Sequence, residues 1–308
     1  MENEEQRTAR SHLRTILWLI VINVILRGLW VAVVQPKQIA DFEWYFTHAT
    51  QMAQGQGYVW GGHYTAYWPI GWPFILSILF RLTGPHVLAG LIANVSFSIG
   101  IVLLVYWTTL SFFRSRRIAV FAAFGYSLLP SQIEWNAILG SEESFTFFLF
   151  LGLYLYARST LASRDRTIVL LLAAGLGVGI ATDIRPVPLL FPVVVLIYEL
   201  VLQRRNWLYG VARSAAFTAV MALGVLPVTL RNYFTMHHFV IVSTNGGVNL
   251  WQGTNIDGGY YWSWLPWQNP LLVAQGNEIL QNQIGQRVAI QYILSHPMST
   301  LWHGALKI

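Results

Sequence analysis

Long apolar runs recur along the chain and constrain its fold more than any other feature. They lie at residues 16–34, 86–113, 118–131, 142–157, 167–183, 187–202 and 208–230. A helix needs about 20 predominantly apolar residues to cross a bilayer, and flanking polar residues can complete the shorter runs. Only 10% of the residues are charged, against roughly 25% in an ordinary soluble domain. The runs therefore predict an all-α fold, a polytopic membrane helix bundle of about seven transmembrane helices.

The cations predict the orientation of this bundle. Their clusters fall on one side if each run crosses the membrane once. The clusters are Arg7, Arg10 and Arg14; Arg114, Arg116 and Arg117; Arg158, Arg164 and Arg166; and Arg204 and Arg205. Cytoplasmic loops carry an excess of Lys and Arg. We therefore expect a multi-pass cell-membrane protein with a cytoplasmic amino terminus and chemistry on the outer, periplasmic or extracellular, side. Such small clusters do not indicate nucleic-acid binding, although the net charge is +6.

The same topology divides the chain into two parts. Residues 1–230 would form a seven-span module that includes an outer loop at 35–85, and residues 231–308 would form a polar segment on the outer face. Counting residues 69–82 as a span would move later arginine clusters to the outside. We therefore expect the helices of the first loop to lie along the outer interface, where tryptophans are common.

The first outer loop contains a candidate catalytic acid, Asp41. If a helix begins there, Tyr45 and His48 share a stripe with Asp41, whereas Glu43 points roughly 200° away. Asp41 is either an N-cap residue or a general base that removes a proton from an acceptor hydroxyl or amine. One carboxylate is enough when the leaving group is a phosphate, because phosphate departs without a proton.

A phosphate leaving group needs positive charge beside it. Arg185 and Arg231 lie at outer ends of spans and could bind phosphate oxygens, although interfacial snorkelling explains each of them too. Glu142 could bind a sugar, a metal or Arg185, or belong to a plain interfacial loop. The histidines show no helical ligand spacing, so we predict no metal ligands and no certain cofactor, and leave a divalent ion open.

Four local patterns are shared with a known superfamily. They are Asp41, Tyr45 and Ala49 in the first loop; YWPIGWP at 67–73 before an apolar helix ending at Gly84; Ser141-Glu142 before a span; and Arg231-Asn232-Tyr233 followed by STNGGVNLW at 243–251. The chain resembles the GT-C superfamily of polyprenyl-phosphate-sugar transferases, in particular bacterial relatives of protein O-mannosyltransferases and the lipid A aminoarabinose transferase.

The resemblance implies a membrane glycosyltransferase. It would transfer a hexose or pentose from a polyprenyl-phosphate-sugar donor to a lipid, glycan or protein acceptor, with Asp41 as the base. The candidate substrate-binding residues are Glu43, Tyr45, Glu142, Arg185, Arg231 and Asn245. Members of the superfamily usually continue with more spans, so we expect the chain to be truncated at its carboxyl terminus.

Two other classes of function stay open on the sequence. A membrane transporter would use Arg27, which lies inside the first apolar run, and an outer pair of Asp183 and Arg185 to mark a substrate path. A non-catalytic lipid-binding scaffold would bind the donor without transferring its sugar.

Overall fold

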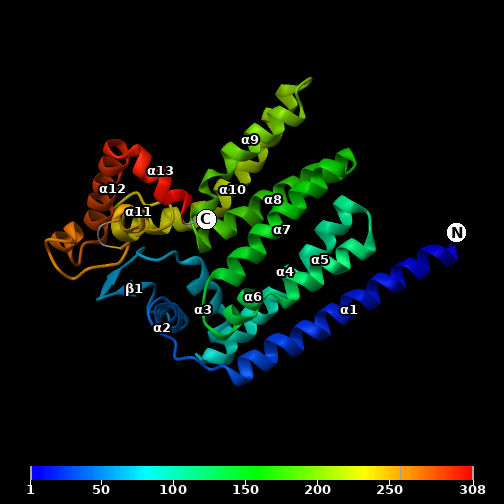
Figure 1. The fold of residues 1–308 in the computed structure, drawn as a ribbon, viewed down its shortest axis with the longest axis horizontal. Helices are drawn as coiled ribbons and strands as arrows, with labels where there is room; N and C mark the ends of the chain where they lie inside the picture. The colour runs from blue at the N-terminus through cyan, green and yellow to red at the C-terminus, as the bar shows by residue number, and fades with distance from the viewer. Residues whose placement is uncertain (1, 257–258, 307–308) are drawn as a thin grey trace.

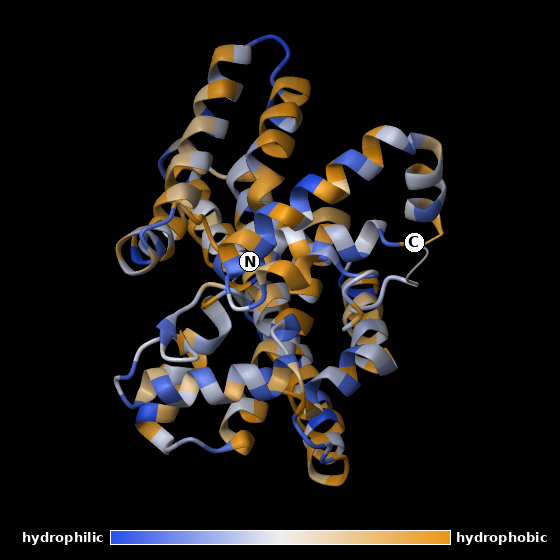
Figure 2. Cartoon of the chain, turned by 90° about the vertical axis from the view of Figure 1, so that its left-hand side faces the viewer, coloured by the Kyte–Doolittle hydropathy of each residue, from blue (hydrophilic) through white to orange (hydrophobic). Residues whose placement is uncertain are grey.

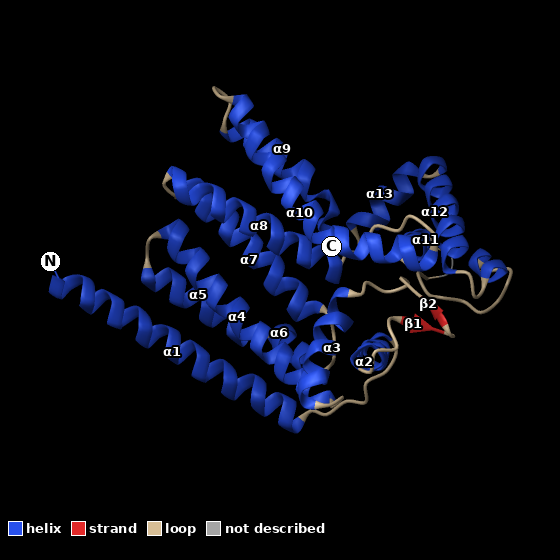
Figure 3. Cartoon of the chain, turned by 180° about the vertical axis from the view of Figure 1, so that it is seen from behind, coloured by secondary structure: helices blue, strands red, loops and turns tan. Residues whose placement is uncertain are grey.

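The chain folds as an all-α membrane helix bundle, which confirms the predicted fold class (Figure 1). The structure, a computed structural model, describes residues 2–256 and 259–306, so Asp257, an acid predicted on the outer side, lies outside the described residues. Across the described ranges, strands are limited to one antiparallel hairpin of β1 (Val59–Trp60) and β2 (His63–Tyr64), drawn in red in Figure 3.

Each predicted apolar run corresponds to one helix of the bundle. These helices are α1 (Glu2–Val33), α4 (Val87–Phe113), α5 (Arg116–Leu128), α7 (Glu142–Leu161), α8 (Arg164–Ile184), α9 (Phe191–Leu202) and α10 (Trp207–Met236). Figure 2 shows hydrophobic residues recurring along the helices and hydrophilic residues in several connecting loops. Large apolar side chains stay exposed on the bundle, as expected where lipid rather than water covers them.

Length and hydropathy together set four of these helices apart. Within the described residues, four helices are long and apolar enough to cross a membrane: most of α1, α4, most of α8 and α10. By contrast, α5 and α9 extend over only about 20 Å. Short segments adjoin these two helices: α6 (Pro130–Glu134) and η1 (Trp135–Ala137) follow α5, and η2 (Val187–Leu190) precedes α9.

Glycines let α8 approach its neighbours closely. A Cβ atom on Gly177 would lie 3.3 Å from Cα of Gly152 on α7, and one on Gly179 would lie 2.8 Å from the Met221 carbonyl oxygen on α10. Close approach through small residues is the usual way in which membrane helices gain contact area. The centre of the bundle is therefore the triple α7–α8–α10.

The two ends of the bundle differ in content. The amino terminus and the connections α4–α5, α7–α8 and α9–α10 lie at one end, which is also the end of the arginine clusters (Figure 1). The other end carries α2 (Asp41–Ala53), the β-hairpin, α11 (Gly246–Thr254), η3 (Pro270–Ala274), α12 (Glu278–Ser295) and α13 (Pro297–Ala305). The predicted grouping of cations at one end is thus present, whereas their cytoplasmic side stays a prediction.

The first loop packs through two short helices, α2 and α3 (Gly71–Thr83). Tyr45 and Ala49 of α2 form a buried cluster with Trp72, Leu76 and Phe80 of α3, and with Ile184 at the end of α8. The backbone of α3 begins directly against α8, since a Cβ atom on Gly71 would lie 2.5 Å from the Asp183 carbonyl oxygen. This junction fixes α2, and with it Asp41, over the end of α8.

The segment after α10 returns to the first loop. The backbone N–H of Thr244 donates to the Ala66 carbonyl oxygen at 2.9 Å. Trp251 of α11 packs in a buried cluster with Leu271 and Ala289, against which Tyr67 of the first loop also packs. The two polar parts of the chain therefore form one layer at this end of the bundle.

Candidate functional site

Asp41 is the first residue of α2 and is half-buried. The N-cap position belongs to Ala40, which has φ 51°, and no side chain caps this helix. The N-cap interpretation of Asp41 is therefore wrong. Burial raises the pKa of the Asp41 carboxyl, as does the Glu142 carboxylate, while Arg185 lowers it. A carboxylate with a raised pKa is a better proton acceptor, which suits a general base.

Glu142 and Arg185 form an ion pair beside Asp41. Glu142 begins α7, and Arg185 follows the last residue of α8. Arg185 Nη2 donates to Glu142 Oε1 at 2.6 Å, and Arg185 Nε donates to Ser141 Oγ at 3.1 Å. The Arg185 side chain remains 40% exposed, so part of the guanidinium stays open to a ligand. Of the partners that the sequence left open for Glu142, the structure shows Arg185.

Tyr45 connects the α2 helix to the same group. It is buried on the predicted stripe together with His48, and its hydroxyl hydrogen-bonds to Ser141. Burial raises the pKa of Tyr45 to about 12, against the opposing effect of the Ser141 hydrogen bond. Tyr45 is therefore protonated at neutral pH. Glu43 is exposed on α2, and the structure does not bring it to this cluster.

Arg231 belongs to a second cluster. Its Nη1 donates to the Thr65 carbonyl oxygen at 2.6 Å, and its Nη2 donates to the Tyr58 carbonyl oxygen at 2.8 Å. The guanidinium also lies over the rings of Tyr58 and Tyr64, at 5.6 and 5.5 Å from the centroids. Arg231 therefore anchors the first loop to α10, so simple snorkelling does not describe it.

An apolar cavity of about 480 Å³ opens beside Arg231. Segments of α3, α7, α8 and α10 line it, with Phe74, Phe148 and Pro227 among the apolar side chains. Two charged residues, Asp183 and Arg231, complete the lining. An apolar cavity with a cation at its wall fits a ligand that has a hydrocarbon tail and an anionic group.

Charged groups of both clusters act on Tyr67 of the first loop. Burial raises its pKa, and the Asp41 and Glu278 carboxylates raise it further. Glu278 in turn accepts hydrogen bonds from Thr65 Oγ1 at 2.5 Å and from the Ala66 N–H at 2.9 Å. The Asp41 cluster and the Arg231 cluster are thus neighbours at one end of the bundle.

Several predicted residues have structural partners of their own. Asn245 is buried, precedes α11 and accepts a hydrogen bond from Ser243 Oγ at 2.9 Å. Arg27 is fully buried and donates to Ser98 Oγ at 2.6 Å, so it has a protein partner within the bundle. Sequence reasoning did not assign Ser141, Tyr67 or Glu278 to the site, although Ser141 and Tyr67 lie in two of the patterns shared with the GT-C superfamily. Only their contacts with residues far away in the sequence place them there.

Metal ligation has little support in the described part of the chain, where no group of three or more His, Cys, Asp or Glu side chains could hold an ion. The carboxylates of the site have other partners: Glu142 binds Arg185, and Glu278 binds the first loop. The side chains of this site present carboxylates, phenols and guanidinium groups.

Comparison with known proteins gives one match. The family model described as dolichyl-phosphate-mannose-protein mannosyltransferase matches residues 72–243, from α3 to the segment after α10. This match covers more than half of the chain and includes Glu142, Arg185 and Arg231, whereas Asp41 and Asn245 lie outside it. No curated protein sequence and no solved structure matches the chain. Since the family model spans the core of the bundle and both arginines of the site, the chain belongs to the dolichyl-phosphate-mannose-protein mannosyltransferase family, a member of the GT-C glycosyltransferases.

Proposed function

We propose that the protein transfers a sugar from a polyprenyl-phosphate donor to an acceptor, with Asp41 as the general base. The observation that carries this proposal is the position of Asp41: half-buried, near both Glu142 and Arg185, with a raised pKa. In the reaction an acceptor O–H or N–H group attacks the anomeric carbon. The bond from that carbon to the phosphate oxygen breaks, the phosphate leaves with the electron pair, and Asp41 takes the acceptor proton.

The donor would bind with its two chemical parts in different surroundings. The 480 Å³ cavity offers apolar walls to the isoprenoid chain, and Arg231 lines that cavity. Arg185, whose charge acts on Asp41, is the candidate partner of the phosphate that leaves. An Arg guanidinium makes paired, charge-assisted hydrogen bonds to phosphate oxygens. Glu142 would hold Arg185 in position until the donor binds. Tyr45 and Asp41 would lie on either side of the bound sugar.

The family description supplies the first substrates to test. It names dolichyl phosphate mannose as the donor and a protein as the acceptor. We therefore propose a polyprenyl-phosphate mannose donor, with a serine- or threonine-bearing protein as the first acceptor class. Glu43 and Asn245 stay candidate substrate contacts, Glu43 on the exposed face of α2 and Asn245 before α11.

The site would face the outer side of the membrane. The arginine clusters belong to the amino-terminal segment and to the α4–α5, α7–α8 and α9–α10 connections, at the opposite end of the bundle from α2, which begins at Asp41 (Figure 1). Since cytoplasmic loops are enriched in Lys and Arg, this arrangement supports a cytoplasmic amino terminus and an outer site. The orientation is tested by introducing single cysteines into this cysteine-free chain and labelling intact cells with an impermeant maleimide.

The experiment that tests the function uses the full chain in lipid vesicles. Polyprenyl-phosphate mannose, labelled in the sugar, is added with a Ser/Thr-rich peptide, and the label is followed by chromatography. Glycosyl transfer predicts label in the peptide and an equal amount of free polyprenyl phosphate. Uptake of label into the vesicle lumen without transfer would support the transporter, and donor binding without transfer would support the scaffold.

A further inference from the structure

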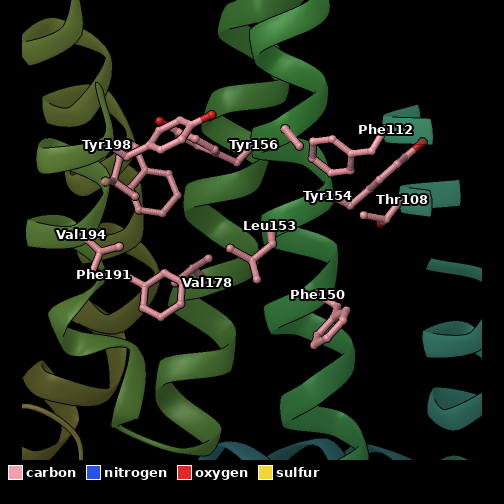
Figure 4. Close-up of a pocket in the computed structure, with 14 residues that line it drawn as sticks. Thr108, Phe112, Phe150, Leu153, Tyr154, Tyr156, Val178, Phe191, Val194 and Tyr198 are labelled. Atoms are coloured by element: carbon pink, nitrogen blue, oxygen red, sulfur yellow. The ribbon is translucent and has the colours of Figure 1, made fainter. Parts of the chain in front are cut away.

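A second hollow lies far from the candidate catalytic site, within the helices of the bundle. It is an apolar groove of about 410 Å³ among α4, α7, α8 and α9, with one residue of α10. Figure 4 shows Phe112 and Tyr154 on one side of it and Phe191 and Tyr198 on the other. On α7 the groove extends from Phe150 to Ala157, which is about 10 Å of helix. Its lining is almost wholly apolar or aromatic, so it fits a hydrocarbon chain.

A polar pocket adjoins this groove toward the arginine-rich end. It has a volume of about 240 Å³ and is lined by Ser111 and Arg114 at the end of α4, and by Arg158, Leu161 and Ala162 at the end of α7. The same two helices line the groove, through Thr108 and Phe112 of α4 and through Tyr154 and Ala157 of α7. One path therefore leads along α4 and α7 from an apolar wall to two guanidinium groups.

Tyr154 joins the groove to the pocket. Arg158 Nη1 donates to the Tyr154 hydroxyl at 3.0 Å, and the guanidinium lies 5.9 Å from the centroid of the Tyr154 ring. Tyr154 thereby holds Arg158 at the end of the groove. Among the side chains that the structure describes, neither Arg114 nor Arg158 is paired with a carboxylate. The buried Arg213 by contrast is neutralised by Glu199 at 2.7 Å. Two positive charges are thus uncompensated where the groove ends.

We propose that this path binds an anionic phospholipid, with an acyl chain in the groove and the phosphate between Arg114 and Arg158. Basic pockets between membrane helices at their cytoplasmic ends recognise anionic headgroups, and guanidinium groups bind phosphate oxygens by charge-assisted hydrogen bonds. The donor of the proposed reaction does not explain this pocket. Arg158 and Glu142 lie on α7 about 24 Å apart along the helix axis, so a phosphate here is remote from Asp41.

The test measures lipid retention by the full chain. The protein is purified in mild detergent, exposed to equal amounts of phosphatidylglycerol and phosphatidylcholine, and examined by native mass spectrometry. We expect phosphatidylglycerol to be retained at least about fivefold over phosphatidylcholine. The double variant R114Q/R158Q is expected to retain the two lipids equally. The matched control R204Q/R205Q removes the same charge at the same end of the bundle and should keep the preference.

A third variant separates a lipid from a free phosphate. L153W fills the groove without changing its charge, since Leu153 lines only the apolar part, and we expect it to lower phosphatidylglycerol retention several-fold. The proposal would be overturned in favour of a simple anion site if L153W retained phosphatidylglycerol unchanged and millimolar inorganic phosphate displaced the lipid. Equal retention of both lipids by the unmodified protein, or the same loss in R204Q/R205Q, would also overturn it. Melting temperatures measured in phosphatidylcholine show whether each variant is folded, so loss of lipid binding through unfolding is detected.

Discussion

Arg185 donates a 2.6 Å hydrogen bond to Glu142, which joins the end of α8 to the start of α7. Both charges act on the pKa of Asp41, Glu142 raising it and Arg185 lowering it. One ion pair therefore holds two helices of the bundle together, and after burial its two charges are the next influences on the pKa of the candidate base. This coupling gives two variants whose effects on the pH profile have opposite signs.

Replacing Glu142 by Gln should lower the pKa of Asp41. The variant removes a negative charge that disfavours the ionised base. Since the base acts when deprotonated, activity falls as the pH drops through its pKa, and the acid limb of log kcat/KM against pH should move to lower pH. The matched control is Glu134→Gln, an exposed acid that does not act on Asp41. An acid limb that moves upward would contradict the assignment.

Replacing Arg185 by Gln should have the opposite effect on the same profile. Loss of the positive charge raises the pKa of Asp41, so the acid limb should move to higher pH. The donor KM should also rise, by about tenfold or more for a lost charge-assisted contact. Steady-state kinetics over a pH series measure both quantities. An unchanged donor KM in Arg185→Gln would contradict the proposed role of Arg185 in binding the phosphate.

Loss of the buried ion pair of Glu199 and Arg213 should lower the stability of the protein without a direct effect on the reaction. Glu199 Oε1 accepts hydrogen bonds from Arg213 at 2.7 Å and from the Tyr156 hydroxyl at 2.5 Å. Arg213→Met leaves the Glu199 carboxylate buried and unpaired, which should cost about 3–5 kcal/mol of unfolding free energy. Thermal unfolding in detergent measures the loss. The double variant Glu199→Leu with Arg213→Met should recover most of it, and failure to recover would locate the cost elsewhere.

The close contact at Gly71 predicts that the junction between α3 and α8 contributes to stability. A Cβ atom there would lie 2.5 Å from the Asp183 carbonyl oxygen, so Gly71→Ala must push the two helices apart. We expect a loss of about 1–3 kcal/mol in unfolding free energy, and weaker donor binding because Gly71 lines the apolar cavity. Gly28→Ala is the matched control, since nothing lies within 4 Å of its Cβ position. Equal melting temperatures for the two variants would count against this close packing.

Sequence patterns predicted the parts of this protein that depend on local chemistry. The apolar runs predicted seven helices, and helical periodicity predicted that Tyr45 and His48 share one stripe while Glu43 points away from it. The structure buries Tyr45 and His48 and leaves Glu43 exposed. The placement of arginines predicted which connections share one end of the bundle. These features follow from hydrophobicity and periodicity, which act over a few residues.

The rest depends on tertiary contacts that no local pattern encodes. Glu278 binds Thr65 and Ala66 of the first loop, and Arg231 binds backbone carbonyl oxygens of Tyr58 and Thr65. A backbone acceptor exists at every residue, so the sequence does not indicate which one a guanidinium will select. The sequence left a sugar, a metal and Arg185 open as partners of Glu142, and only the packing of α7 against α8 shows that Arg185 is the partner in space.

Asp41→Asn tests the central claim most directly. Sugar transfer from polyprenyl-phosphate mannose is measured for the variant in vesicles, beside Glu134→Gln, which changes an exposed acid outside the candidate site. Loss of a general base predicts a fall in kcat of about 100-fold or more, with donor binding retained and Glu134→Gln close to the unmodified protein. Unchanged turnover in Asp41→Asn would contradict the proposed mechanism.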